Sequence, residues 1–293
     1  MEWIIEKKHE GMLLRDYLRE VRGFSRRILK AVKFDGGAIL VNGIEQSVRY
    51  PLSAGDKLMI HFPKESRSNS MQPEPMELSI IYEDNDILVI NKASGLPAIP
   101  SFHHPNGTLA NGLLAHYEKQ KSSATVHIVT RLDRDTSGLL LVAKHRYSHS
   151  ILAAQQQTKA VQRTYQAIVE GCLSKQAGTI HAPIGRKPGS IIEREIRSDG
   201  KDAVTHYKVE KKTTKHSFIT VQLETGRTHQ IRVHFSGTGY PLCGDTLYGG
   251  STHLIKRQAL HCSLLSFIHP ITKELLYFTA ELPQDMVNVL QKM

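Results

Sequence analysis

The stretch of the sequence with the greatest capacity for chemistry is a charged loop between two apolar runs. Residues 131–138 read Arg-Leu-Asp-Arg-Asp-Thr-Ser-Gly, and the runs 126–129 and 139–142 on either side are predicted to be short strands. A carboxylate fixed in such a loop can add to a substrate or remove a proton from it. Aspartate and serine also form turns by hydrogen bonding to backbone amides, so a purely local role for either aspartate is the alternative.

Two other segments contain residues of kinds that act in catalytic sites. Residues 163–165 read Arg-Thr-Tyr, and residues 225–234 read Thr-Gly-Arg-Thr-His-Gln-Ile-Arg-Val-His. From composition alone, Tyr165 would be a half-buried strand tyrosine and Arg232 a surface arginine.

Other common chemistries find little support in the sequence. Sixteen histidines raise the question of a metal site, but there is no His-x-His or His-Glu-x-x-His arrangement. Ser137 stands in Thr-Ser-Gly and not in the Gly-x-Ser-x-Gly turn of many serine hydrolases. No glycine-rich phosphate loop is present either. We therefore expect neither a metal nor a cofactor.

Residues 1–62 are predicted to form a small module of helices and strands. One helix is indicated by apolar residues near Leu14, a second begins at Ser25, and strands are expected at 38–41 and 56–62. The second helix carries four cations, namely Arg26, Arg27, Lys30 and Lys33, of which Arg26, Lys30 and Lys33 are expected to cluster on one side. For a lone amphipathic helix, a solvated charged face is the simpler interpretation.

Residues 63–76 are rich in proline and serine and are predicted to be a linker, which leaves 77–293 as the body. Many short strands with few long helical patterns predict an α+β body built on a mixed sheet. Within it, Thr228 is predicted to cap a short helix that runs to Ser236, with Gly237 directly after its end.

The charge of the chain points to a class of partner. The net charge is +10 and the pI is about 9.4, which favours nucleic acid as a partner. The alternative is that the excess positive charge only keeps the protein soluble. No apolar run is long enough to span a bilayer, and the first residues lack the order of a secretory signal. Three widely spaced cysteines fit a reducing compartment. We expect a cytoplasmic protein without a membrane partner.

The loop at 131–138, followed by the apolar run to Lys144, resembles the signature of the RluA-type family of RNA pseudouridine synthases, Arg-Leu-Asp-x-x-Thr-Ser-Gly. The resemblance extends from about Leu78 to Pro283. It includes further segments, namely Asn91-Lys92, Arg163-Thr-Tyr165, Thr225 to His234, Tyr240 to Asp245, Leu260-His261 and His269-Pro270. Residues 1–62 resemble the small αL-type RNA-binding domain of a ribosomal protein and of several RNA-modifying enzymes.

This resemblance implies a fold, a reaction and a set of roles. The fold would be that of pseudouridine synthases, with a central mixed, mainly antiparallel sheet behind a small α/β RNA-binding module. Asp133 would be the catalytic carboxylate, with Arg232 keeping it charged and Tyr165 stacking on the target base. Arg131 would help to displace that base, and Leu260 would either form the pocket floor or belong to the core. Whether Asp133 attacks the ribose, attacks the ring or removes the 2′ proton stays open.

Three positions depart from the family's pattern, and one rival function remains. Thr130, Ala93 and Cys262 stand where the family usually has His, Pro and Ala, and none replaces a residue assigned to chemistry. The rival is an inactive RNA-binding or ribosome-assembly protein on the same fold. The front module favours ribosomal RNA over transfer RNA as the target, and we expect a monomer.

Overall fold

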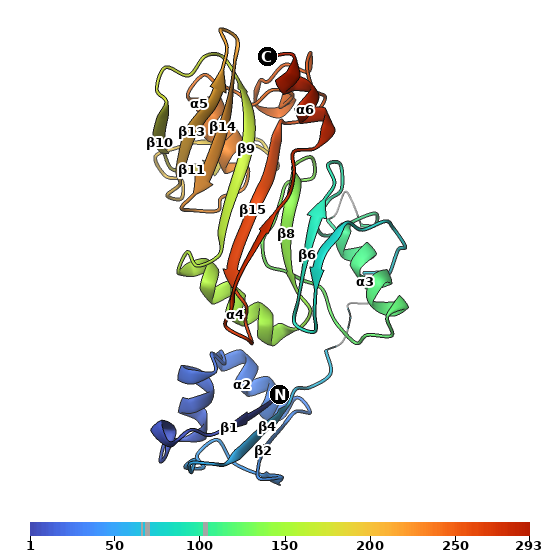
Figure 1. Cartoon of the computed structure of the whole chain (residues 1–293), viewed down its shortest axis with the longest axis vertical. Coiled ribbons are helices and arrows are strands. Elements are labelled where there is room, and N and C mark those ends of the chain that lie inside the picture. Colours follow the sequence, from blue (N-terminus) through green and yellow to red (C-terminus); the bar gives the residue numbers. More distant parts are fainter. Residues whose placement is uncertain (66, 68–70, 102–104) are drawn as a thin grey trace.

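The computed structural model of the chain contains, among the residues that it describes, a four-stranded front sheet, a ten-stranded sheet and a two-stranded hairpin, with the front sheet set apart from the other two (Figure 1). It describes residues 1–65, 67, 71–101 and 105–293. The first sheet lies within residues 2–61, and the second begins at Ile80. The predicted linker at 63–76 includes residues 66 and 68–70, which lie outside the described residues.

The front part is a four-stranded antiparallel sheet covered by short helices. Its strand order is β1-β4-β2-β3, and Asn42-Gly43 makes the tight turn from β2 to β3 with positive φ angles of 52° and 81°. Its elements are β1 (Glu2–Ile4), η1 (Lys7–His9), α1 (Leu14–Asp16), the π-helical turn η2 (Tyr17–Val21), α2 (Arg26–Phe34), β2 (Ala38–Val41), β3 (Ile44–Glu45) and β4 (Lys57–His61).

Helix α2 begins where the sequence predicts and has the predicted two-sided character. The hydroxyl of Ser25 accepts a hydrogen bond from the backbone N–H of Ile28 at 3.2 Å, which satisfies one of the free donors of the first turn. Ile28 and Val32 are buried against the front sheet. The four predicted cations are all exposed, namely Arg26, Arg27, Lys30 and Lys33.

The body is built on a ten-stranded sheet in the order β10-β13-β14-β9-β15-β8-β6-β5, with β16 beside β15 and β7 beside β8. Among the described residues, only β8 and β15 pair in parallel, so the predicted mixed, mainly antiparallel sheet is confirmed. The strands are β5 (Ile80–Glu83), β6 (Ile87–Lys92), β7 (His127–Ile128), β8 (Ser137–Ala143), β9 (Gln162–Glu170), β10 (Ala177–His181), β13 (Val204–Lys212), β14 (His216–Leu223), β15 (Leu260–Ile268) and β16 (Leu275–Thr279).

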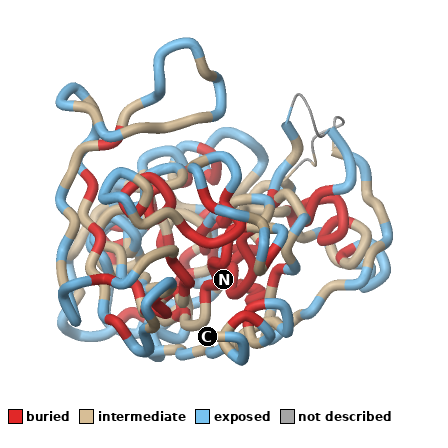
Figure 2. Tube along the Cα trace, turned by 90° about the horizontal axis from the view of Figure 1, so that it is seen from above, coloured by how far each residue is buried: buried red, intermediate tan, exposed pale blue. Residues whose placement is uncertain are grey.

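Helices and one separate hairpin complete the body. Every residue of β8 is buried, and Figure 2 shows buried segments gathered in the interior with exposed loops around them. No helix in the described ranges has the length and apolar character needed to cross a bilayer. The elements are α3 (Leu109–Lys119), α4 (Arg146–Gln157), α5 (Gln230–Gly237), the 3-10 turn η3 (Thr246–Tyr248), α6 (Gln284–Gln291), and the hairpin strands β11 (Ile184–Arg186) and β12 (Arg194–Ile196).

The start of α5 differs from the sequence prediction. The helix begins at Gln230 after His229, which has a left-handed backbone with φ of 57°, so the prediction that Thr228 caps it is wrong. The side-chain carbonyl of Gln230 accepts the backbone N–H of Arg227 and the hydroxyl proton of Thr225. These two bonds fix the turn before the helix. The helix therefore begins one residue later than it would with Thr228 as its cap. Gly237 is the last helical residue and not the one after it.

The front part contacts the body through α4. Tyr147 lies against Phe24 and Phe62, with ring centroids 4.6 and 5.4 Å away, and its hydroxyl donates a 2.6 Å hydrogen bond to the carbonyl of Arg22. Ile151, one turn further along α4, belongs to the same apolar cluster. The opposite end of this helix, at Gln156, reaches the cleft described below. Helix α4 therefore links the front part to the rim of that cleft. Figure 1 shows the helix beside the front part.

Candidate active site

The loop that carries Asp133 is anchored from beneath by Lys92. This lysine is 1% exposed, and its Nζ donates hydrogen bonds to the carbonyls of Ala93, Leu96 and Arg134 at 2.8, 2.8 and 2.9 Å. Burial lowers the pKa of Lys92 to about 8. Three backbone carbonyls from two segments, residues 93–96 and the Asp133 loop, are thus held by one side chain, which uses all three of its donors.

Arg232 is shared between two carboxylates. Its Nη1 donates to Asp133 Oδ2 at 3.0 Å, while Nε and Nη2 donate to the two oxygens of Asp245 at 2.7 and 2.8 Å. Asp245 is 1% exposed and Arg232 is 6% exposed. Although burial opposes the charged form, the hydrogen bonds to Asp245 and the charge of Asp133 raise the pKa of Arg232. The arginine is therefore a fixed cation beside Asp133.

His229 and Tyr248 complete this side of the site. His229 Nε2 lies 3.9 Å from Asp133 Oδ2, and its Nδ1 lies 2.8 Å from the hydroxyl oxygen of Tyr248. The guanidinium of Arg232 sits 5.0 Å from the centre of the Tyr248 ring. Burial lowers the pKa of His229, which keeps its ring neutral near pH 7. Residue types and spacing alone do not single out His229, Tyr248 or Asp245.

Tyr165 stands on β9, opposite Val221 of β14 and Cys262 of β15. The residue is 4% exposed, and its hydroxyl accepts a 3.1 Å hydrogen bond from Arg163 Nη1. Burial raises the pKa of Tyr165, so its hydroxyl stays protonated. The ring is thus fixed in one wall of the site, where an aromatic face can meet a planar base.

A cleft of about 770 Å³ brings the predicted residues of the body together. Arg131 is exposed in its lining, and among the described residues this arginine has no side-chain hydrogen bond or ion pair. Leu260 is 3% exposed and belongs both to the core and to the cleft lining, so its two predicted placements are compatible. The five predicted residues that line the cleft are Arg131, Asp133, Tyr165, Arg232 and Leu260. The four cations of α2 do not line it.

None of the three departures from the family's pattern lines the cleft. Thr130 is fully buried, and its hydroxyl oxygen accepts the backbone N–H of Leu141 at 2.9 Å. Ala93 contributes a carbonyl oxygen to Lys92, a bond that is independent of its side chain. Cys262 is fully buried, and burial raises the pKa of its thiol to about 12. These residues serve packing and backbone support.

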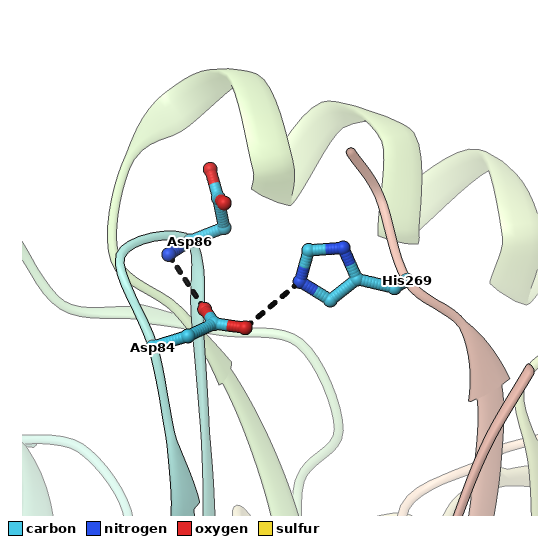
Figure 3. Close-up of side chains that lie close together, drawn as sticks. All are labelled: Asp84, Asp86 and His269. Carbon is cyan, nitrogen blue, oxygen red and sulfur yellow. Dashed lines mark hydrogen bonds and ion pairs between the residues drawn. The ribbon is translucent and has the colours of Figure 1, made fainter. Parts of the chain in front are cut away.

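A second polar cluster, drawn in Figure 3, lies where the β5–β6 turn meets the end of β15. The ligand atoms of Asp84, Asp86 and His269 are within 4.8 Å of one another, which is a spacing that could suit a metal ion. Asp84 already accepts hydrogen bonds from two backbone N–H groups, from Tyr82 and from His269, and Asp86 pairs with His145. These bonds give the cluster a structural role in joining the turn to α4 and β15.

Comparison with known proteins identifies the family. The profile of the family described as RNA pseudouridylate synthase matches residues 86–237, which is just over half of the chain. The chain belongs to this family. The matched range contains both the Asp133 loop and Arg232, so the cleft described above is the candidate active site of an RNA pseudouridine synthase.

Curated relatives and solved structures agree with this assignment. The synthase is 51% identical over 280 residues to a protein of Bacillus subtilis named as an uncharacterized RNA pseudouridine synthase, covering 96% of this chain and 99% of the relative. It is 40% identical over 268 residues to the ribosomal large subunit pseudouridine synthase D of Pseudomonas aeruginosa, covering 87% and 83% of the two chains. The structure of human RNA pseudouridylate synthase domain containing 1 superposes with a TM-score of 0.58 and 25% identity, over 74% of this chain and 86% of that one.

Proposed function

We propose that Asp133 is the carboxylate that reacts with the target uridine. Making pseudouridine requires breaking the bond between N1 and C1′, rotating the uracil, and bonding C5 to the same C1′. Attack on the ribose, attack on the ring and removal of the 2′ proton all need an ionised oxygen at one fixed place. The observation that carries the proposal is the 3.0 Å bond from the buried Arg232 to Asp133 at the wall of the cleft.

We further propose roles for the two residues that would handle the base. Tyr165 stacks on the uracil, because its ring is fixed in the cleft wall and its hydroxyl is held by Arg163. Arg131 helps to displace the target base from its helix, because it is an exposed and unpaired cation among the described residues lining the cleft. A side chain that occupies the vacated position offsets part of the energy lost by unstacking the base.

The substrate that we propose is ribosomal RNA of the large subunit, in preference to transfer RNA. Relatives at 36–40% identity are named as large-subunit ribosomal synthases, and residues 1–62 present the four exposed cations of α2. In this proposal residues 1–62 bind RNA, 63–76 connect, and 77–293 carry out the reaction. The enzyme acts as a monomer in the cytoplasm, and it needs neither a metal nor a cofactor.

The experiment that tests the target is a map of pseudouridines in ribosomal and transfer RNA from cells with and without the gene. We expect at least one position of the large-subunit RNA to lose its pseudouridine and to regain it when the gene is restored. A loss confined to transfer RNA would refute the proposed substrate. An unchanged map, together with an inactive purified protein, would favour the alternative of an inactive RNA-binding protein.

A further inference from the structure

We propose that His229 is a further catalytic residue, whose Nε2–H donates a hydrogen bond to a carbonyl oxygen of the uracil ring. The inference rests on the proposed role of Asp133. It starts from geometry, because His229 lines the cleft and its Nε2 is 3.9 Å from Asp133 Oδ2. A base whose ribose or ring reaches Asp133 therefore comes within reach of this imidazole.

The hydrogen bonds behind the ring determine which nitrogen carries the proton. The hydroxyl oxygen of Tyr248 accepts a hydrogen bond from the backbone N–H of Arg194 at 2.9 Å. Its own proton is then directed to His229 Nδ1, only 2.8 Å away. With Nδ1 as the acceptor, a neutral imidazole has its proton on Nε2, on the side that faces Asp133.

The backbone and the burial of His229 support a role in the cleft. It is one of five non-glycine residues with a positive φ among the described residues, and this conformation carries a free-energy penalty that the surroundings must offset. Its side chain is only 12% exposed, and burial lowers its pKa, so the ring stays neutral near pH 7. A neutral imidazole donates at Nε2 without bringing a second positive charge next to Arg232.

Negative charge on the ring is common to all three routes left open for Asp133. Attack on C1′ and removal of the 2′ proton each expel uracil with the bonding electron pair, which spreads over N1, O2 and O4. Attack on C6 of the ring instead places the charge on O4. A donor fixed before the reaction stabilises such charge most in the transition state. His229 keeps its proton throughout, and the net transfer is one proton from C5 to N1 after the C5–C1′ bond has formed.

The test replaces the donor and the acceptor separately. Single-turnover rates are measured for the full chain on a synthetic RNA stem-loop with the mapped target as uridine, 2-thiouridine or 4-thiouridine. Sulfur accepts hydrogen bonds more weakly than oxygen, so one of the two thio substrates probes the bond from Nε2. The His229→Asn variant removes the imidazole while asparagine tolerates the left-handed backbone.

We expect His229→Asn to convert uridine about 100-fold more slowly with little change in KM, which is the typical effect of removing one such donor. The wild type should lose about 10-fold on one thio substrate, and the variant should lose less than about 2-fold on the same substrate, since the bond is already absent. Changes in leaving-group strength act on both proteins and cancel in this comparison.

One further variant keeps the proposal falsifiable if His229→Asn folds poorly, and another serves as a control. Tyr248→Phe removes the hydroxyl that fixes the proton on Nε2 and keeps the ring beside Arg232, so we expect a smaller loss of about 10-fold and a reduced thio effect. The matched control is His253→Gln, at an exposed histidine outside the cleft, which should behave as wild type.

The outcomes separate this inference from the function on which it rests. Equal thio effects in the wild type and in His229→Asn would show that His229 has no bond to either oxygen and would overturn the inference while leaving Asp133 in its role. An unchanged rate on uridine in His229→Asn would do the same. A wild type that converts no uridine would overturn the proposed function and this inference together.

Discussion

Replacing Asp245 by alanine would remove both carboxylate oxygens that hold the Nε and Nη2 atoms of Arg232. Removing one partner of a buried ion pair typically destabilises a protein by about 3–5 kcal/mol, because the remaining charge is left without a partner. Arg232 would keep its 3.0 Å bond to Asp133, so we expect the lower end, about 3 kcal/mol. Since a displacement of about 1 Å can slow a reaction 100-fold, we expect a rate loss of that order.

A matched control is available at Asp285. Its two oxygens accept hydrogen bonds from Nε and Nη2 of Arg257 at 2.7 and 2.9 Å, which is the same bidentate geometry. The side chain of Asp285 is 44% exposed, whereas that of Asp245 is 1% exposed. Arg257 is itself only 10% exposed, but it keeps hydrogen bonds to backbone carbonyls when Asp285 is removed, and the Asp285 side of the pair is open to water, so Asp285→Ala should have a smaller effect on stability.

The free energy of unfolding is measured by urea denaturation and followed by circular dichroism, because the single tryptophan, Trp3, lies in the front part. The rate is measured in single-turnover pseudouridine formation. If Asp245→Ala were no less stable than Asp285→Ala, the buried ion pair between Arg232 and Asp245 would contribute less to the free energy of unfolding than we expect. A destabilised variant with a wild-type rate would show that Asp245 does not position Arg232 for the reaction.

Three further predictions follow from other parts of the structure. Lys92→Met leaves three loop carbonyls without their donor, so we expect a loss of about 2–3 kcal/mol in urea denaturation and at least a 10-fold slower reaction. Burial lowers the pKa of His261 to about 4 in the folded protein. As pH falls below about 6.5, His261 is therefore protonated in the unfolded chain before it is protonated in the folded one. Stability should therefore drop by about 2 kcal/mol from pH 7 to pH 5 on account of this residue, and His261→Asn should lack that drop. Changing the four cations of α2 to glutamine should weaken RNA binding and reduce the slope of log K against log salt by up to about 3–4. A stable and active Lys92→Met would contradict the anchoring role of Lys92. An unchanged pH dependence in His261→Asn would contradict the lowered pKa of His261. An unchanged salt slope would contradict RNA binding by the cations of α2.

The parts of the site that the sequence predicts are those whose residues lie in one continuous segment of the chain. The loop around Asp133 and the Arg-Thr-Tyr segment ending at Tyr165 have a definite order of residue types, and the sequence predicts the strands beside them. Asp245 is different, because its importance depends on a 2.7 Å bond to a residue on another element, 13 positions away. Gly244 before it has a φ of 77°, and a Cβ there would lie 2.0 Å from the carbonyl oxygen of Arg257. Such a close approach exists only once these two segments have come together in the folded chain.

The start of α5 and the contact of the front part with α4 show two other limits. A threonine before an apolar run is a sound signal for a helix cap, but the side chain of Gln230 outcompetes it by bonding two groups upstream. From the sequence, Phe24 and Tyr147 each look like core residues of the part of the chain to which they belong. Their contact across the two parts depends on the surfaces that both folded units present, and residue periodicity within one element carries no information about it.

The central claim is that Asp133 performs the reaction in the cleft, and the most direct test compares Asp133→Asn with Asp135→Asn. Asp135 is two residues away in the same loop and pairs with the exposed Arg134. The measurement is pseudouridine formation by the purified full chain on large-subunit ribosomal RNA, with RNA affinity determined in parallel. We expect Asp133→Asn to form no pseudouridine while its RNA affinity stays close to that of wild type, and Asp135→Asn to remain active. Pseudouridine formed by Asp133→Asn at a wild-type rate would contradict the account.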